Sequence, residues 1–200
     1  MPSYNTKAIV LKSFNLGESD KILKLFSQDK GHIDAIAKGA RKIKSKFGGR
    51  LELFNFLELT LSKGKNLDII NQVEIIRNFY SISKDFNKFL FFQLISSIIL
   101  RTHINEEDIS EVIFKLTYTC FNEIEKLSGE NISDIKKITA FFIAKFLKIT
   151  GYVPLILSCS ICDTKIENPV DFIYFSIRFG GVICRNCSNK VENKPELKKI

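Results

Sequence analysis

The sequence predicts an α+β protein, in which an N-terminal OB-fold-like β-barrel precedes an α-helical domain that carries a four-Cys zinc-ribbon-like element. Three observations lead to this prediction: alternating apolar and polar residues up to residue 78, helical periodicity from residue 79, and two Cys-x-x-Cys pairs within residues 159–187. We therefore expect a barrel domain over residues 1–78 and a helical domain over residues 79–200, with its zinc-binding element at 159–187.

Short apolar runs separated by turn sequences fill the predicted barrel. The runs TKAIVLKSF, KILKLFS and HIDAIAK are separated by NLGESD and QDKG, which are typical of turns. Leu57, Leu59 and Leu61 alternate with polar residues, and SKGKN supplies a hairpin turn before Val73 and Ile75 alternate in a returning strand. Five short strands indicate a small barrel of the OB type, with an SH3-like barrel as the alternative.

The period changes to that of amphipathic helices beyond the last predicted strand. The first stripe, expected to be buried, consists of Phe79, Ile82, Phe86, Phe89, Leu90 and Leu94. Asn105 is a candidate N-cap for a second helix, and Ser133 opens a third helix that Gly151 ends. The second helix is expected to bury Ile109, Val112, Ile113, Leu116, Cys120, Ile124 and Leu127. Asn193 and the following KPELKKI indicate one more helix start.

Positive charge is concentrated in the predicted barrel. The formal net charge is +8, and residues 1–80 hold 14 Lys and Arg against 8 Asp and Glu. Residues 81–158 hold 9 of each, and residues 159–200 hold 7 against 5, an excess that four thiolates around a divalent ion would cancel. The barrel is therefore the part that we expect to meet a polyanion.

Neither the N-terminal segment nor the most apolar stretch of the chain predicts membrane insertion. The N-terminal PSYNTKAIVLK lacks the pattern of a signal peptide, and FLFFQLISSIIL, residues 89–100, is too short to span a bilayer. We therefore expect a soluble cytoplasmic protein without a membrane partner. Thiols stay reduced in the cytoplasm, so paired cysteines indicate a metal site before disulfides.

Two Cys-x-x-Cys pairs near the C-terminus have the spacing C-x2-C-x21-C-x2-C, one residue outside the usual zinc-ribbon spacing. The predicted metal ligands are Cys159, Cys162, Cys184 and Cys187. Four thiolates saturate a tetrahedral Zn²⁺ and leave no position for water, so we expect the zinc to be structural rather than catalytic. Asp163 and Ser188 stand where such knuckles often carry Gly. Iron, or a reduced metal-free site, is the alternative.

The segment KGARKIKSKFGGR, residues 38–50, is a candidate nucleic-acid site. It contains six cations and no acid: Lys38, Arg41, Lys42, Lys44, Lys46 and Arg50. The segment joins two predicted strands, where an OB-fold presents a loop to nucleic acid, so we expect these cations to contact phosphates. The alternative is a solvated loop without a ligand. The segment is not a nucleotide-binding P-loop, because no Gly-Lys-Ser/Thr follows its first Gly.

Three aromatic residues near this segment could stack on bases. For Phe14 and Phe26 the barrel core is the better prediction, whereas Phe47 could take either role. His32 and His103 lack a companion nucleophile or carboxylate motif and are predicted to lie on the surface. We therefore expect no catalytic residue and no enzyme activity.

Three stretches of the chain occur in a specific order. They are AIVLKSFNLGESDKILKLFSQDKGHIDAIAKGARKIKSKFGG near the start, GYVPLILSCSIC at 151–162 and FSIRFGGVICRNC at 175–187. With these segments the chain resembles the RecO family of bacterial recombination mediators and DNA-repair proteins along most of its length. Members of that family usually continue for several helices beyond the last Cys-x-x-Cys pair.

The resemblance implies a mediator of DNA repair and homologous recombination. Family members bind single- and double-stranded DNA, anneal complementary strands without ATP, and work with RecR and single-strand-binding protein to load RecA. The family's basic OB surface corresponds here to Lys38, Arg41, Lys42, Lys44 and Lys46, and its zinc site to the four cysteines. A nucleoid-associated protein is the matching expectation for localisation.

Two other functional classes share parts of this pattern. An RNA- or ribosome-associated zinc-ribbon adaptor would also need a basic barrel, and competition between DNA and structured RNA would distinguish it. A metal-dependent nucleic-acid hydrolase would need an open metal position and a general base, and the sequence shows neither.

Overall fold

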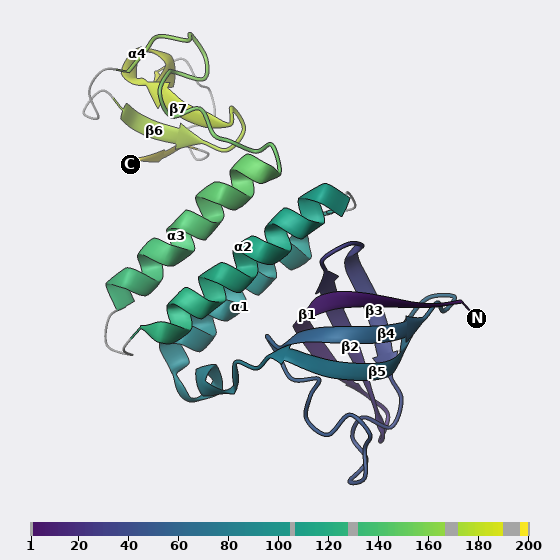
Figure 1. Cartoon of the computed structure of the whole chain (residues 1–200). Coiled ribbons are helices and arrows are strands. Elements are labelled where there is room, and N and C mark those ends of the chain that lie inside the picture. The colour runs from purple at the N-terminus through teal and green to yellow at the C-terminus, as the bar shows by residue number, and fades with distance from the viewer. Residues whose placement is uncertain (1, 105–106, 128–131, 167–171, 190–196, 200) are drawn as a thin grey trace. The chain divides into compact units, whose positions relative to one another are not determined.

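The computed structural model describes residues 2–104, 107–127, 132–166, 172–189 and 197–199. The chain forms two compact units, Met1–Thr150 and Gly151–Ile200 (Figure 1). The boundary that the sequence suggests at residue 78 lies inside the first unit, because the helices that follow the barrel pack against it. None of the helices in the described part of the chain combines the length and the apolar character that crossing a membrane requires.

Five strands close into a barrel in the first unit. They are β1 (Ser3–Leu16), β2 (Asp20–Ser27), β3 (Gly31–Ala37), β4 (Phe56–Ser62) and β5 (Asp68–Arg77). The order around the barrel is β1-β2-β3-β5-β4, and a short parallel contact between β3 and β5 completes it. This OB-like barrel confirms the architecture that the alternating pattern predicts. Leu57, Leu59 and Leu61 lie on the inner side and are fully buried.

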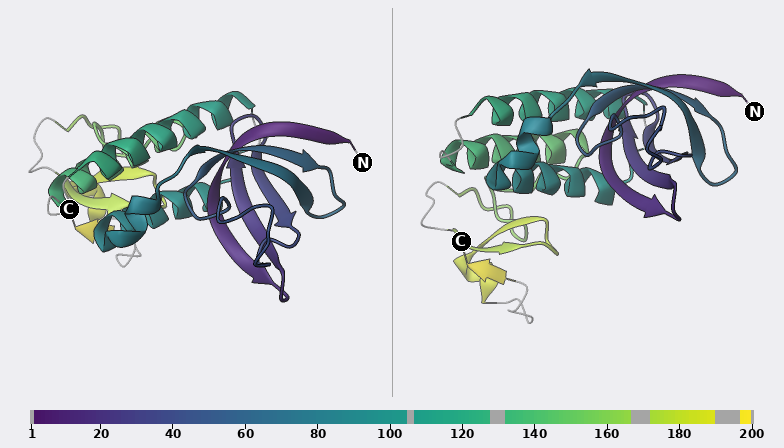
Figure 2. Two further views of the ribbon diagram at one scale, coloured as in Figure 1. Left: turned by 60° about the horizontal axis from the view of Figure 1, so that its bottom comes forward. Right: turned by 90° about the horizontal axis from the view of Figure 1, so that it is seen from below.

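A 3-10 turn and three helices complete the first unit. They are η1 (Tyr80–Lys84), α1 (Phe86–Arg101), α2 (Glu107–Lys126) and α3 (Ile132–Ile149). The Asp85 carboxylate accepts the backbone N–H of Lys88 at 3.1 Å, and this N-cap fixes where α1 begins. Asn105, the predicted cap of α2, lies outside the described residues. The three helices run side by side next to the barrel in both views of Figure 2.

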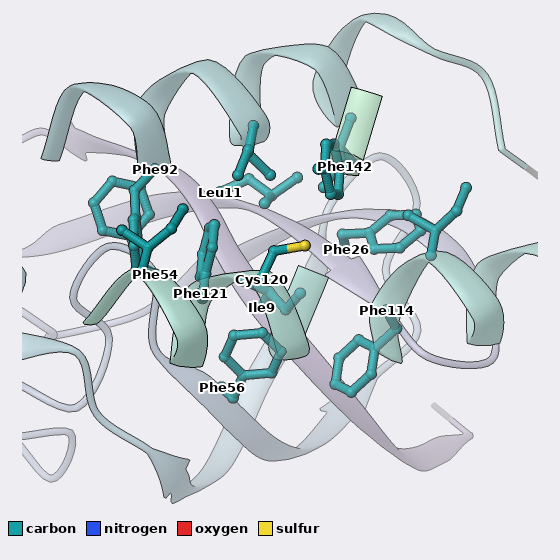
Figure 3. Packing of buried hydrophobic residues seen from close by; sticks show 14 of the residues in the cluster. Ile9, Leu11, Phe26, Phe54, Phe56, Phe92, Phe114, Cys120, Phe121 and Phe142 are labelled. Carbon is teal, nitrogen blue, oxygen red and sulfur yellow. The ribbon is translucent and has the colours of Figure 1, made fainter. Parts of the chain in front are cut away.

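A phenylalanine-rich core joins the barrel to the helices (Figure 3). The barrel contributes Ile9, Leu11, Phe26 and Phe56 from its outer face, and the helices contribute Phe92, Phe114, Phe121 and Phe142. The rings of Phe92 and Phe121 stack with centroids 3.7 Å apart. Each fully buried side chain of this size stabilises the fold by about 1.5–3 kcal/mol, so the barrel and the helices stabilise each other.

The predicted apolar stripe of the first helix is wrong within α1. The exposed members are Phe86, Leu90 and Leu94, with exposed fractions of 73%, 47% and 43%. Phe92 and Ile95 are buried in their place. The prediction assumes one continuous helix from Phe79. In the structure a separate 3-10 turn ends at Asp85 and α1 begins after it, so the buried side of α1 does not continue the stripe that starts at Phe79. In α2, Val112 is also exposed, contrary to expectation, whereas Ile113, Cys120 and Ile124 are buried as predicted.

The described residues of the second unit, 151–166, 172–189 and 197–199, form a small sheet and one helical turn. Its elements are β6 (Phe172–Ser176), β7 (Gly181–Cys184), α4 (Arg185–Ser188) and β8 (Leu197–Lys199), and the strand order is β7-β6-β8. The predicted helix start at Asn193 lies outside the described residues. The described tail pairs with β6 as a strand, so the prediction of a helix there is wrong for residues 197–199.

Candidate nucleic-acid interface and metal centre

The connection between β3 and β4, residues 38–55, carries the predicted cations. It projects from one end of the barrel, below the strands in Figure 1. All six cations, Lys38, Arg41, Lys42, Lys44, Lys46 and Arg50, are exposed. The structure thus places every predicted DNA-binding residue on a single connection that we call the basic loop.

Apolar residues of the same connection hold it against the rest of the unit. Phe47 and Leu51 turn inward and belong to the barrel core, each with 2% of its surface exposed. Phe54 belongs to the core shared with the helices, and its backbone N–H donates to the Val10 carbonyl at 2.8 Å. Phe47 is therefore not available for stacking on a base.

The conformation of Phe54 is unusual. Its φ of 68° lies in the left-handed region, which costs a bulky L-residue about 1–2 kcal/mol. Its ring packs edge-on against Phe89, Phe92 and Phe121 at centroid distances of 5.6, 5.2 and 5.9 Å. These contacts offset the backbone strain, and they fix the end of the connection where it enters β4.

The six cations differ in how they are held. The Arg41 guanidinium donates to the Gly17 carbonyl at 2.6 Å, Lys46 donates to the Asn71 carbonyl at 2.8 Å, and Arg50 donates to the Lys46 carbonyl at 2.9 Å. The side chains of the remaining three, Lys38, Lys42 and Lys44, form no hydrogen bond or ion pair with any described residue. These three ammonium groups are therefore ready to bind an anion without first breaking an internal contact.

Asp20, at the start of β2, fixes the first turn of the basic loop. Its carboxylate accepts the backbone N–H of Gly39 and the hydroxyl of Ser19, both at 2.8 Å. These hydrogen bonds, together with the charges of Lys38 and Lys42, hold the pKa of the Asp20 carboxyl below its usual value. Asp20 therefore stays ionised and orients the backbone from which the lysines project.

The outer face of β1, β2 and β3 presents an aromatic residue beside this loop. Strand register pairs Phe14 with Ile22 and Ile22 with Ile36, so the three side chains form one row on the same face. Phe14 is 41% exposed, and the ammonium of Lys12 lies 4.8 Å from its ring centroid. An exposed aromatic ring flanked by cations is a platform on which a base can stack.

The prediction that Phe14 lies in the barrel core is wrong, and Phe26 is buried in the core between the outer face of the barrel and the helices rather than inside the barrel. Strict alternation from Val10, which is on the inner side, would place Phe14 inside as well. The register between β1 and β2 shifts between Val10 and Lys12. After this bulge the even-numbered side chains of β1 lie on the outer face of the barrel instead of the inner face. A bulge leaves little trace in a single sequence. The sequence feature that could have predicted the exposure of Phe14 is Lys12, two residues before it. Residues two apart in a strand lie on the same face, and a face that carries a lysine is usually exposed.

The four cysteines come together in the second unit. All four Sγ atoms lie within 4.8 Å of one another, and Cys162 Sγ is 3.8 Å from Cys184 Sγ. A tetrahedral ion about 2.3 Å from each sulfur requires sulfurs about 3.8 Å apart. Cys184 ends β7 and Cys187 lies in α4, so the hairpin of β6 and β7 returns the second pair to the first, as the spacing predicts.

Hydrogen bonds around the sulfurs favour thiolate at one end of the cluster. A hydrogen bond with the Thr164 hydroxyl at 3.2 Å, and one with its backbone N–H, lower the pKa of Cys162 to about 6. The hydrogen bond to Cys162 raises the pKa of Cys187 to about 12. The backbone N–H of Cys184 donates to Cys159 Sγ at 3.4 Å. The cluster thus shares protons among its thiols, and a divalent ion would displace them.

The donor set fits a closed metal centre. Cys159 and Cys187 are buried, and no His or carboxylate completes a group with the four thiols among the described residues. Asp163 adopts a φ of 55°, the conformation that Gly usually supplies in such knuckles and that Asp tolerates. The four thiols could therefore hold a metal ion, and Zn²⁺ is the ion that this geometry suits best.

Two family models together match nearly the whole chain. The model described as Recombination protein O N terminal matches residues 1–79, and the model described as Recombination protein O C terminal matches residues 83–200. A relative from Caldanaerobacter subterraneus subsp. tengcongensis, named DNA repair protein RecO, is 34% identical over 194 residues, which cover 97% of this chain and 75% of the relative.

Further relatives with the same name have similar levels of identity. The protein from Acetivibrio thermocellus is 31% identical over 195 residues, which cover 98% of this chain and 73% of the relative. The protein from Nostoc punctiforme is 33% identical over 201 aligned positions, and the alignment covers 98% of this chain and 67% of the relative.

Proposed function

The chain belongs to the RecO family of DNA repair proteins, and we propose on this basis that it binds DNA through its barrel and anneals complementary single strands without ATP. The observation that carries the proposal is the placement of three unpaired lysines beside an exposed phenylalanine on one end of an OB-like barrel. Cations bind the phosphates and the ring stacks on bases, which together make a sequence-tolerant site for a single strand.

Annealing follows from the charge of this surface. Two strands repel each other through their phosphates, and a cationic barrel that holds both lowers the repulsion and raises their local concentration. Pairing then proceeds through the stacking and hydrogen bonding of the strands themselves. No covalent step is required, so the proposed role is that of a mediator rather than an enzyme.

In this proposal the metal centre has a structural role. Cys159, Cys162, Cys184 and Cys187 would hold the ion, and their four thiolates would fill its coordination sphere. When bound, Zn²⁺ supplies a cross-link between two distant Cys-x-x-Cys pairs. Annealing should therefore survive a chelator for as long as the first unit stays folded.

The family also suggests protein partners, namely RecR, single-strand-binding protein and, through them, RecA, at work on the nucleoid. The exposed apolar residues of α1 and α3 support one of these interactions. Phe86, Leu90, Leu94 and Phe141 are exposed, and the Lys145 ammonium lies 5.7 Å from the Phe141 ring centroid. Exposed apolar side chains and a cation beside one of them suit the acidic and apolar tail of single-strand-binding protein. Titration of a labelled tail peptide into the full chain should show saturable binding that Phe141→Ala weakens.

The decisive experiment on DNA binding neutralises the unpaired lysines of the basic loop. Combining Lys38→Gln, Lys42→Gln and Lys44→Gln should reduce the slope of log Kobs against log salt for single strands by about 2, because each lost phosphate contact changes it by about 0.7. Annealing of complementary oligonucleotides should slow in parallel and stay independent of ATP. The melting temperature should change little, since none of the three side chains forms a hydrogen bond or ion pair with a described residue.

A matched control changes three exposed lysines elsewhere, Lys65→Gln, Lys136→Gln and Lys148→Gln, and should leave the slope unchanged. An unchanged slope in the loop variant would show that the basic loop is not the phosphate site. Stronger competition by structured RNA than by single-stranded DNA would favour the adaptor alternative. Metal-dependent cleavage of the oligonucleotide that is lost with Cys184→Ser would favour a hydrolase.

A further inference from the structure

A pocket of about 620 Å³ lies where the outer face of β1–β3 meets the C-terminal end of α1. This volume is in the range of sites that take a small ligand. Lys12, Lys24 and Asp34 line it from the strands, and Arg101, Thr102 and His103 line it from the end of the helix. The strands and the helix share one hydrophobic core, so the walls of the pocket are held in place.

The charges around the pocket are not balanced. Lys12 and Lys24 face each other directly across β1 and β2, an arrangement that destabilises a sheet unless a negative charge offsets it. Asp34 accepts hydrogen bonds from Lys24 at 2.8 and 3.1 Å and offsets one of the two charges. Neither Lys12 nor Arg101 forms an ion pair with any residue that the structure describes. Among the described residues, Lys12 and Arg101 thus have no acidic partner, and an anion in the pocket would stabilise both charges.

Arg101 by itself would not indicate a ligand. Basic residues are common in the last turn of a helix because they complement its dipole, and Lys126 and Lys148 occupy the same position in α2 and α3. Arg101 differs from them because it lines a pocket together with the cations of two strands. Gathering cations from three elements around one hollow is unfavourable without an anion, and this juxtaposition points to a ligand.

His32, predicted to lie on the surface, is half-buried at this junction. Its Nε2 is 2.8 Å from the Thr102 carbonyl oxygen, which can only accept, so Nε2 carries the proton. Burial lowers the pKa of His32 and keeps the ring neutral near pH 7. This hydrogen bond joins β3 to the end of α1 and fixes one wall of the pocket.

Three successive rows of side chains on the outer face of β1 and β2 connect the basic loop to the pocket. The pair of Leu16 and Asp20 lies next to the loop, the row of Phe14 follows, and the row of Lys12 and Lys24 borders the pocket. The distance along β1 from Leu16 to Lys12 is roughly 13 Å at about 3.3 Å per residue. Cations, an aromatic ring and cations again thus follow one another across a single face, which is the order that suits a strand of alternating bases and phosphates.

We propose that this pocket is a phosphate subsite for single-stranded nucleic acid, so that a strand stacked on Phe14 continues from the barrel onto the end of α1. The inference rests on the proposed function and extends the binding surface beyond the basic loop. It gives Lys12 and Arg101 a ligand, and it explains why the like charges of Lys12 and Lys24 are placed opposite each other.

The two histidines of the chain make the proposal directly testable. The sequence contains only His32 and His103, and both line the pocket. Imidazole signals in a heteronuclear NMR spectrum therefore report on this pocket alone. Titration of an oligothymidylate into the full chain should shift the His103 signal, and this shift should saturate together with the fluorescence anisotropy of the labelled oligonucleotide.

The matched variants separate the pocket from the basic loop. Lys12→Gln with Arg101→Gln should weaken binding, reduce the salt slope by about 1.4, at about 0.7 per contact, and abolish the shift of the histidine signals. Lys65→Gln with Lys136→Gln removes the same charge elsewhere and should behave as the unchanged protein does. Lys12 and Arg101 are exposed, and an unchanged dispersion of the backbone amide signals in each free variant will show that it is folded.

Four results would overturn the subsite or limit it. Binding by anisotropy without any change in the histidine signals would overturn the subsite and leave the basic loop as the DNA site. Histidine signals that shift as much in the Lys12→Gln, Arg101→Gln variant as in the unchanged protein would overturn the subsite too. Shifts with inorganic phosphate at the concentration of the oligonucleotide phosphates would show a site for the free ion rather than for a strand. No binding of the oligonucleotide by either measurement would overturn both the subsite and the proposed function.

Discussion

The two units of the chain differ in what stabilises the fold of each. The first unit has two large clusters of buried apolar residues, one inside the barrel and one between the barrel and the helices. The buried cluster in the described part of the second unit consists of Cys159, Ile183 and Cys187, with Cys184 packed against it. The candidate metal ligands are therefore most of its core. A module with so little apolar surface to bury depends on a cross-link, and metal binding is then part of its folding free energy.

The same difference decides which groups are available for a ligand. In the first unit Phe47, Leu51 and Phe54 hold the basic loop, so Lys38, Lys42 and Lys44 need not contribute to the fold. In the second unit the reactive side chains are themselves the structural ones. We therefore expect substitutions of the cysteines to act on folding, and substitutions of the loop lysines to act on binding.

The largest effect should come from removing one thiol of the cluster. Cys184→Ser leaves three thiolates, so the second unit should lose its metal, about one ion per chain, and unfold, because structural zinc contributes on the order of 10 kcal/mol or more to such modules. Metal analysis and calorimetry should show both losses, while the transition of the first unit and DNA binding remain. Cys120→Ala, which removes a buried thiol of α2, is the control and should keep the metal. Full metal content in Cys184→Ser would contradict the assignment of the ligands.

Phe54 tests how firmly apolar contacts hold the basic loop. Phe54→Ala should lower the free energy of unfolding of the first unit by about 3–5 kcal/mol, since it leaves a cavity among three rings. Phe54→Gly should be less destabilised than Phe54→Ala by about 1 kcal/mol, because Gly adopts a positive φ without strain. Denaturant unfolding measures both values. A glycine variant less stable than the alanine variant would show that the backbone strain is absent.

A buried lysine provides a polar cross-link within the first unit. The Lys88 ammonium, with the residue 9% exposed, donates to the carbonyls of Glu125 and Leu127 at the end of α2, at 2.9 and 2.6 Å. Lys88→Met should cost about 1–3 kcal/mol, because those carbonyls lose their donor. Lys115→Met, which removes only an exposed ion pair with Glu111, should cost less than about 1 kcal/mol. Equal effects of the two substitutions would show that the buried contacts add nothing.

The sequence predicts features that depend on local periodicity and spacing. The alternation of Leu57, Leu59 and Leu61 predicts β4, and the cysteine spacing predicts the cluster, since both are properties of neighbouring residues. Features that depend on irregular backbone are missed. The bulge that exposes Phe14, the 3-10 turn that resets α1, and the inward turn of Phe47 each change which side of the chain faces the core. The pocket beside Arg101 could not be predicted either, because it requires the docking of a helix end against three strands.

The smallest expected effect is a loss of stability of the first unit in acid, caused by protonation of His32. Burial lowers the pKa of His32 in the folded protein below the value of about 6.5 that the unfolded chain has. The unfolded chain therefore binds more protons below that pH, and the stability that neutral His32 contributes is present above about pH 6.5 and is lost as the pH falls. The slope from one proton cannot exceed about 1.4 kcal/mol per pH unit. His32→Gln, which keeps a donor for the Thr102 carbonyl, should flatten the pH dependence of denaturant unfolding of the first unit below about pH 6.5. If His32→Gln has the same pH dependence as the unchanged protein, the junction between β3 and α1 does not hold a neutral imidazole.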